Sequence, residues 1–284
     1  MFNTIGKIIK WIGQHFLGML FLLIVVLVLM PTSSTELKPA NLQEIQLAGP
    51  ILNADAILKE IETVQKDTKI KGVLLNINSP GGSVPPSIEI AYAIKALKKH
   101  KPVVVYASGI MASGSYYSAI YADKIIANPG SIVGSIGVIM ESANIEELMK
   151  TIGIQTQIVK QGTYKEAGTP TRKWTPEERA ELEKLTKDTY DLFVKDVADA
   201  RGLQISDSKK YADAHIFSAR RAKEVGLIDD VGVKGQAKAE IEKLAKVTDP
   251  VWKEKDKLES FMEQFAEKSM LQLQNYFYGL KATF

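Results

Sequence analysis

Residues 71–86 read KGVLLNINSPGGSVPP, and this stretch decides the class of fold. Its apolar run, residues 73–77, is short and bounded by turn residues, which is typical of a strand buried on both faces. The segment Ser79–Gly82 breaks the strand. Pro85 and Pro86 then open a helix, because proline is tolerated in a first helical turn. A buried strand that passes through a glycine turn into a helix is the repeating unit of a parallel α/β sheet.

The sequence on both sides continues the pattern. A helix is predicted from about Ala54 before this stretch, and the small-residue segment 108–121 after it is predicted to contain another. Further strands are predicted at 103–106, 124–127, 136–139 and 155–159, with a short helix at 145–150. The second half is mostly helical: a capping box at Thr175–Glu178 starts a long helix that Gly202 ends, and helices follow at 218–225 and 233–246. The class is therefore α/β, built of repeated strand–strand–helix units around a mainly parallel sheet.

The composition excludes several kinds of catalytic site. The 284 residues include no cysteine and only three histidines, at positions 15, 100 and 215. There is therefore no disulfide, no thiolate zinc site and no cysteine nucleophile, and the absence of an HExxH motif removes one class of zinc protease. We expect neither a metal nor a cofactor. Because His15 lies in the apolar N-terminal run, only two histidines remain for a soluble domain. If this chain is a hydrolase, we expect another residue to serve as its base.

The N-terminus predicts a membrane segment. Phe16–Met30 is 15 residues without charge, and extension back to Trp11 gives 20. A membrane-spanning helix needs roughly 20 apolar residues and a signal-peptide core about 7–15, so the run lies between the two. Without a good A-x-A cleavage pattern after it, we favour an uncleaved anchor at residues 11–30 over a cleaved signal peptide. Lys7 and Lys10 precede it, which places the rest of the chain on the extracytoplasmic side of the cell membrane.

The remainder divides into a predicted cytoplasmic end at 1–10, a linker at 31–40, a catalytic domain at 41–250 and a helical tail at 251–284. Beyond residue 30 the chain holds 34 basic and 33 acidic side chains, out of 36 and 33 in the whole sequence. This nearly neutral body has no basic stripe, so nucleic acid is not an expected partner.

Two small-residue segments could carry chemistry. In the glycine turn, Gly81 and Gly82 let backbone N–H groups face an oxyanion or a phosphate, although a lone glycine pair is more often only a tight turn. Ser113 follows the next strand and is a candidate nucleophile, without the G-x-S-x-G pattern of the hydrolase elbow. A lysine whose burial favours the neutral amine could serve as its base. Spacing alone does not single out Lys165 from the other lysines.

At these residues the sequence resembles the signal peptide peptidase A family, in its short, membrane-anchored form. The agreeing blocks are NSPGGSV (78–84), MASGSYYSAIYADKIIANPGSIVGSIGVI (111–139), TYKEAGTP (163–170) and FSARRAKEVGLIDDVG (217–232). They keep their order and together span nearly all of residues 70–232. The resemblance implies a Clp-protease/crotonase-like fold and a serine peptidase with a Ser-Lys dyad.

Carried over residue by residue, the resemblance implies that Ser113 is the nucleophile and Lys165 the general base. Ser135 would orient that lysine, and the N–H groups of Gly82 and Gly114 would form the oxyanion hole. One departure is Ser115, where the family usually has glycine; because it lies past the oxyanion donor, we expect the change to be tolerated.

The family also implies partners and a substrate. Its long members carry two copies of this domain and this chain one, so the resemblance implies a ring-shaped homo-oligomer with active sites lined by neighbouring subunits. Substrates would be peptides, above all cleaved signal peptides lying in the bilayer. Two alternatives stay open: a crotonase-type acyl-CoA enzyme on the same fold, and a non-catalytic membrane scaffold.

Overall fold

The computed structural model describes residues 11, 13–22, 25 and 38–254, and the chain divides into two compact units, Met1–Pro39 and Ala40–Phe284. In the first unit the described residues 11, 13–22 and 25 are helical, and Lys38 and Pro39 are not. No helix among the described residues combines the length and the apolar character needed to cross a membrane. Part of the predicted anchor at 11–30 and nearly all of the predicted tail at 251–284 lie outside the described residues, so both stay predictions.

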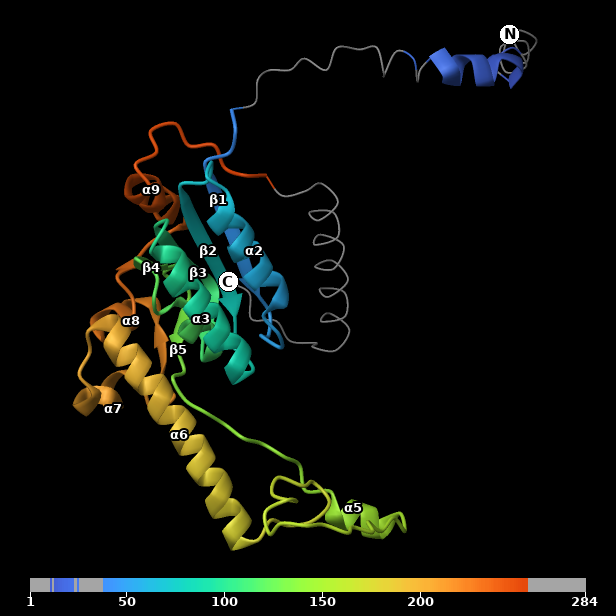
Figure 1. Ribbon diagram of the computed structural model, residues 1–284, viewed down its shortest axis with the longest axis vertical. Helices are drawn as coiled ribbons and strands as arrows, with labels where there is room; N and C mark the ends of the chain where they lie inside the picture. Colours follow the sequence, from blue (N-terminus) through green and yellow to red (C-terminus); the bar gives the residue numbers. More distant parts are fainter. Residues whose placement is uncertain (1–10, 12, 23–24, 26–37, 255–284) are drawn as a thin grey trace. The chain divides into compact units, whose positions relative to one another are not determined.

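Within residues 38–254, seven strands form one sheet (Figure 1). The strands are β1 (Leu42–Ala48), β2 (Gly72–Ser79), β3 (Val103–Ala112), β4 (Lys124–Ala127), β5 (Ile132–Gly134), β6 (Ile216–Ser218) and β7 (Asp230–Val231). Strands β1, β2, β3, β4 and β7 lie side by side in that order and run parallel. Only β6 is antiparallel, and it pairs with β5. The prediction of a mainly parallel sheet is confirmed.

Strand β3 is long enough to take a different partner in each half. Its first half pairs with β4, and its last residues, Ile110–Ala112, pair with β5. Between the halves the register with β2 shifts, and the Asn78 side chain accepts a hydrogen bond from the Ile110 N–H at 3.0 Å. A Cβ on Gly109 would lie only 2.4 Å from Asn78 Oδ1, so a larger residue at this bulge would displace the Asn78 amide that bonds Ile110. The bulge allows the ends of β2, β3 and β5 to meet at one edge of the sheet.

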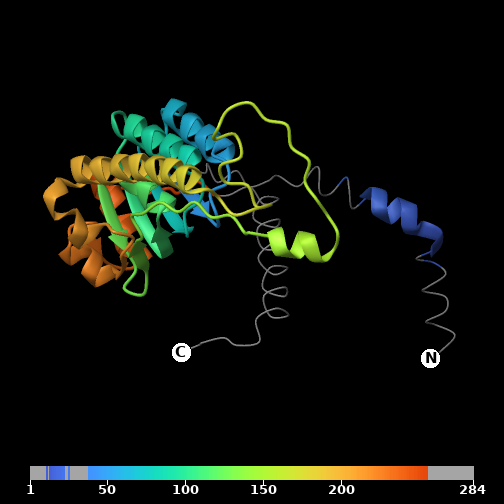
Figure 2. The same cartoon turned by 90° about the horizontal axis from the view of Figure 1, so that it is seen from below.

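Helices cover both faces of the sheet (Figures 1 and 2). On one face α2 (Asp55–Lys66), α3 (Val84–Lys98), α4 (Gly114–Ala119) and the C-terminal half of α6 (Pro176–Arg201) bury apolar side chains in the larger core. On the other face α9 (Lys234–Leu244) packs Ala237 and Ile241 against Leu74 and Val104. The remaining helices are short: α5 (Glu146–Thr151), α7 (Ser208–Tyr211), α8 (Ala219–Glu224) and a 3₁₀ turn at Ile205–Asp207.

The helix boundaries follow the sequence signals. Helix α6 starts at the predicted capping box, in which Thr175 and Glu178 bond each other's backbone N–H, and ends at Gly202 with φ +66°. Helix α3 begins with Val84 and the two prolines, as expected of a first turn. In α2 the buried Ile57, Ile61 and Val64 recur at helical spacing.

Two predicted strands are wrong. Residues 136–139 leave the sheet, because positive φ angles at Gly134 and Ser135 turn the chain away after β5. Residues 155–159 (QTQIV) lie outside the sheet, exposed, in the segment that joins β5 to α6. We call this segment, residues 138–175, the arm; it contains α5 and extends beyond the sheet edge in both views (Figures 1 and 2).

Candidate active site

Ser113 occupies the turn between β3 and α4. Its backbone has φ +54° and ψ −125°, a conformation that side chains rarely adopt and that costs about 1–3 kcal/mol. Its N–H donates to the Gly134 carbonyl at 2.8 Å, which holds the turn against the end of β5. The result is a strand-to-helix elbow that projects the serine from the sheet edge, even though the hydrolase elbow motif is absent from the sequence.

Strained backbone gathers around this serine. Of the five described non-glycine residues with positive φ, four belong to connected turns: Ser113, Ser135, Asp213 and Ala214. The Ser135 N–H donates to the His215 carbonyl at 2.7 Å, and the Ala214 N–H donates to the Ile136 carbonyl at 2.9 Å. The loop after α7 therefore braces the segment that follows β5. Strain held in place by several hydrogen bonds is typical of a functional site.

We expect the strain at Ser113 to be measurable as stability. Glycine adopts φ +54° without steric cost, whereas alanine keeps the strain and loses only the hydroxyl. The Ser113→Gly variant should therefore exceed Ser113→Ala in free energy of unfolding by about 1 kcal/mol, after the greater entropy of glycine in the unfolded chain is subtracted. Urea unfolding of both variants measures the difference. A less stable glycine variant would show that the turn is not strained.

The glycine turn and the elbow bring two amides together. The Ile51 N–H donates to the Gly81 carbonyl, and the Ile51 carbonyl accepts from the Ser83 N–H. Ile51, which follows β1 in the chain, therefore holds the turn on both sides of Gly82. A Cβ on Gly114 would lie 3.3 Å from the Gly82 nitrogen and 2.2 Å from Ser87 Oγ. Neither the Gly82 nor the Gly114 N–H has a hydrogen-bond partner among the described residues. Two unpartnered N–H groups beside a serine are the donors that an oxyanion needs.

Ser115 lies beneath this pair. It is fully buried, its hydroxyl donates to the Ser79 carbonyl at 2.6 Å, and it accepts from the Ala112 N–H at 2.9 Å. The hydroxyl thus links the end of β2 to the end of β3, below the two oxyanion donors. The departure from the family pattern at this position adds a polar link between the two turns and leaves the pocket lining unchanged, because Ser115 does not line it.

Ser135 lies close to the elbow, whereas Lys165 lies on the arm. Ala112 on β3 is paired with Gly134 on β5. Ser113 directly follows the first of these residues and Ser135 the second. Lys165 lies in the arm, exposed, in a turn where its N–H donates to the Gly162 carbonyl at 3.3 Å. It is absent from the residues that surround Ser113 in the pocket. The structure therefore brings four of the five predicted site residues to one sheet edge and leaves the predicted base on the arm.

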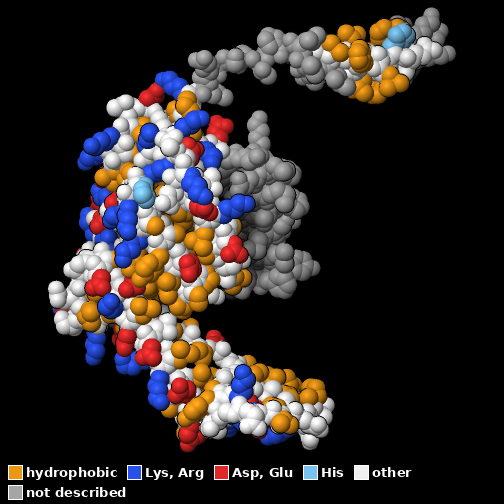
Figure 3. All heavy atoms as spheres, in the orientation of Figure 1, with side chains coloured by type: hydrophobic (Ala, Val, Ile, Leu, Met, Phe, Trp, Pro, Cys, Tyr) orange, Lys and Arg blue, Asp and Glu red, His pale blue; other side chains and the backbone are white. Residues whose placement is uncertain are grey.

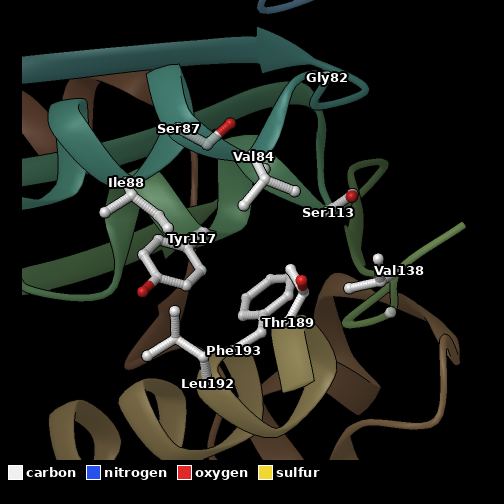
Figure 4. A pocket seen from close by; sticks show the side chains of 12 residues that line it. Gly82, Val84, Ser87, Ile88, Ser113, Tyr117, Val138, Thr189, Leu192 and Phe193 are labelled. Carbon is white, nitrogen blue, oxygen red and sulfur yellow. The ribbon is translucent and has the colours of Figure 1, made fainter. Parts of the chain in front are cut away.

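A pocket opens beside Ser113 (Figure 4). Its walls come from the start of α3, from α4, from α6 and from the segment after Ser135. The side chains that line it are mostly apolar: Val84, Ile88, Tyr117, Val138, Leu192 and Phe193. Ser113 stands at one side, next to the turn that holds Gly82, and the Tyr117 hydroxyl points away from it. The pocket is placed to receive a side chain of a molecule bound at Ser113.

The hydroxyl groups that line this pocket are already bonded within the protein. Ser87 Oγ donates to the Ser83 carbonyl, and Thr189 Oγ1 donates to the Leu185 carbonyl. The Tyr117 hydroxyl donates to the carboxylate of Asp196, a short contact in the interior. Burial, together with this bond to Asp196, raises the pKa of Tyr117 above its usual range, so its proton stays in place. A polar group entering the pocket would find few free partners.

The arm is joined to the start of α6 by charged side chains. Arg172 contacts both oxygens of Glu178, at 2.9 and 2.7 Å, and also contacts Glu166 at 3.2 Å. The hydrogen bonds from Arg172 and from the Thr175 N–H lower the pKa of Glu178 to about 2. Apolar side chains on the same arm are exposed, as Figure 3 shows, among them Ile139, Leu148, Ile152, Ile154, Ile158 and Val159.

Sequence reasoning missed the pocket side chains and the arm's ion cluster. Leu192 and Phe193 lie at helical spacing with the other apolar residues of the long helix, and such periodicity does not separate a core contact from a pocket wall. Charged residues at 160, 166, 172 and 178 have no spacing that marks a cluster, because the turn between them sets their distances.

The comparisons with known proteins agree with this geometry. The profile of peptidase family S49 matches residues 95–248, which is more than half of the chain. This chain belongs to peptidase family S49. The Clp protease profile matches residues 40–129, the part that builds the first strands and the elbow. The sheet therefore has the Clp-protease-like fold that the resemblance implied.

Individual relatives of this S49 member include a candidate protease of Methanocaldococcus jannaschii, 46% identical over 67% of this chain and 61% of its own length. A candidate signal peptide peptidase SppA of Enterococcus faecium is 33% identical over 81% of this chain and 67% of its own. A ClpP1 variant from Listeria monocytogenes superimposes on 68% of this chain and 93% of its own with a TM-score of 0.48 and 16% identity. The S49 family profile and the sequence relatives carry the assignment to the signal peptide peptidase A family, and the chain is a protease of that family.

Proposed function

We propose that this S49 member is a membrane-anchored serine endopeptidase that cleaves apolar peptides through Ser113, with Lys165 as its base. The observation that carries the proposal is the strained elbow at Ser113, beside two amide donors that have no other partner in residues 38–254. Neither a purely structural turn nor a scaffold needs a serine with φ +54° at a pocket mouth. Peptide hydrolysis uses each of these features.

The steps follow from the groups present. The neutral amine of Lys165 takes the proton from Ser113 Oγ while the oxygen attacks the peptide carbonyl. The developing oxyanion accepts hydrogen bonds from the Gly82 and Gly114 N–H groups. The lysine then gives its proton to the leaving amine, the C–N bond breaks, and an acyl-enzyme remains. A water molecule, deprotonated by the same lysine, attacks the ester and releases the acid, which regenerates Ser113.

The lysine would come from a neighbouring copy of the chain. A lysine becomes a base only where burial favours its neutral form, and in the single chain Lys165 is exposed. The arm that bears it presents Leu148, Ile152 and Val159 to solvent, which a second copy would cover. An arm of one subunit that reaches the elbow of the next makes a heterologous contact, which produces a ring when the rotation between subunits closes. Ser135 would orient the incoming amine from the elbow side.

The substrate would be a peptide with an apolar side chain at the cleaved bond. The pocket beside Ser113 has an apolar lining, and its hydroxyls are bonded internally. With the predicted anchor at residues 11–30, the enzyme would meet cleaved signal peptides at the extracytoplasmic face of the cell membrane. These peptides are apolar over most of their length, which suits this pocket.

The pocket gives a direct test of the proposal. A peptide with leucine before the cleaved bond should be hydrolysed about 10- to 100-fold more efficiently than the same peptide with glutamine, because the buried amide would lack partners. The Val84→Asp variant should lose most of this preference, since the carboxylate would enter the pocket mouth. Measurement of kcat/KM for both peptides on full-length protein in detergent tests both statements.

The matched control is Leu244→Asp, an equally exposed leucine on α9, which packs on the other face of the sheet. It should leave kcat/KM unchanged for both peptides. Equal hydrolysis of the leucine and glutamine peptides by the wild type would refute the assignment of the pocket, and no hydrolysis of any peptide would refute the peptidase itself.

A further inference from the structure

Arg172 connects the carboxylate of Glu166 on the arm with that of Glu178 in the first turn of α6. Its guanidinium pairs with both oxygens of Glu178 in a bidentate arrangement, and the same Nη2 reaches Glu166 Oε2 at 3.2 Å. Nη1 also donates to the Lys173 carbonyl at 3.0 Å. Lys160 contacts Glu166 from the other side at 2.5 Å. These five contacts leave the arginine and Glu166 little rotational freedom.

Glu166 is the residue directly after Lys165. Both lie in the turn 162–168, where the Lys165 N–H donates to Gly162 and the Ala167 N–H donates to Tyr164. A side chain that holds Glu166 therefore holds the backbone that carries Lys165. Trp174 adds a second link, because its indole N–H donates to the Thr169 carbonyl at 2.8 Å.

Glu178 provides the fixed end of this connection. Only 2% of its surface is exposed, and its carboxylate also accepts the Thr175 N–H at 2.9 Å as part of the capping box of α6. The C-terminal half of α6 is built into the core through Phe193, Val194 and Val197. The connection thus runs from the core along α6 to Glu178, through Arg172 to Glu166, and on to Lys165.

An exposed ion pair contributes little to stability and would carry no functional argument. The Arg172–Glu178 pair differs, because one partner is buried, the contact is bidentate, and the carboxylate has a further backbone donor. Breaking such a pair leaves an uncompensated carboxylate. The arm contains no other described link of this strength between the turn and the helix.

We propose that Arg172 is the positioning residue for Lys165, holding the turn that bears the base against the start of α6 through Glu166 and Glu178. The inference rests on the proposed role of Lys165 as the base. Arg172 does not touch the reacting atoms in this scheme. It fixes where the amine stands when the arm meets the elbow of the next subunit, and it keeps the Glu166 carboxylate occupied.

The second effect has a signature in pH. The charged groups around Glu166 are Lys160, Arg172, its chain neighbour Lys165 and, across the arginine, Glu178. Without the arginine, Glu166 keeps only Lys160 and becomes free to pair with Lys165. An ion pair favours the protonated amine, so a larger fraction of the base would be inactive at neutral pH. The rise of activity with pH should then move to higher pH.

The experiment compares full-length wild type, Arg172→Gln and Glu166→Gln in a peptide cleavage assay across pH. We expect kcat to fall on the order of 10²-fold in both variants, with KM nearly unchanged, because a displaced catalytic group loses rate more than binding. Only Arg172→Gln should shift the pH–rate profile upward, since Glu166→Gln removes the competing carboxylate. Guanidinium ion, at concentrations far below those that unfold proteins, should restore part of the activity of Arg172→Gln alone.

The control variant is Arg220→Gln. Arg220 lies on α8, its ion pair with Glu224 is long, at 3.8 Å, and both side chains are exposed. It should keep wild-type kcat and pH dependence. If Arg172→Gln fails to fold or assemble, Glu166→Gln decides, and its undiminished kcat would overturn the proposal.

A third variant, Lys165→Met, separates the positioning role of Arg172 from the proposed role of Lys165 as the base. An inactive Lys165→Met together with normal kcat and pH profiles in Arg172→Gln and Glu166→Gln would refute the positioning role alone. An active Lys165→Met would refute the base assignment, and the positioning role with it.

Discussion

Replacement of Ser113 by alanine is expected to abolish peptide hydrolysis while the protein stays folded. The variant lacks the only atom that can form the acyl-enzyme, and the oxyanion donors at Gly82 and Gly114 would remain in place. Residual catalysis by the oxyanion hole limits the loss, so we expect turnover to fall by at least about 10³-fold. Cleavage of a quenched-fluorescence peptide with leucine before the cut bond measures it, and circular dichroism confirms the fold.

Ser108→Ala is the matched control for this experiment. Ser108 lies on β3, the strand that leads into Ser113, and its hydroxyl makes only a 3.3 Å contact with the Ile77 carbonyl, away from the pocket. It should retain wild-type turnover. Substantial cleavage by Ser113→Ala would place the nucleophile elsewhere, and tight binding of CoA by the wild type would favour the acyl-CoA alternative on this fold.

The sequence predicted the central part of the fold well because its signals are local. The glycine turn after β2, the prolines of α3 and the capping box of α6 each specify a boundary within four residues of chain. The failures at 136–139 and 155–159 have one cause: a short run that contains β-branched residues forms a strand only if another strand is there to pair with it. Positive φ at Ser135 turns the first run away, and the second lies on the arm.

The candidate site was predictable to the extent that its residues follow strand ends. Gly82, Ser113 and Ser135 each lie just past the carboxyl end of a parallel strand, and such ends meet at one edge of the sheet. The pocket was not predictable, because Tyr117 and Phe193 approach each other only after α4 and α6 have packed. Nor could spacing place Lys165, since its position depends on where the arm points and on what it touches.

That dependence gives Lys165 a different status from the serine. Ser113 is held by the sheet of its own chain, whereas Lys165 is held by the arm, whose apolar side chains have no partner among the described residues. A catalytic pair divided between a rigid elbow and an arm of this kind would be complete only after assembly. Isolated chains would then be inactive, which protects a cell from an unassembled protease.

A mixture of two inactive variants is therefore expected to regain activity. Ser113→Ala subunits keep the lysine and Lys165→Ala subunits keep the serine, so a contact between the two kinds can hold one complete pair. In randomly mixed rings at equal amounts, about a quarter of the contacts would be complete, because each side is intact with a probability of about one half. Turnover should rise from near zero to roughly a quarter of the wild-type value. The two proteins are mixed after dissociation in detergent, reassembled and assayed.

The control replaces one partner with the double variant Ser113→Ala/Lys165→Ala, which leaves every contact incomplete and should stay inactive when mixed with Ser113→Ala. If Ser113 and Lys165 of the same chain formed the catalytic pair, both mixtures would stay inactive, however well they assemble. Dilution gives a second distinction, because shared sites lose activity per subunit as rings dissociate, whereas sites within one chain do not. Complementation that also disappears on dilution would establish that the arm of one subunit supplies the base to the elbow of the next.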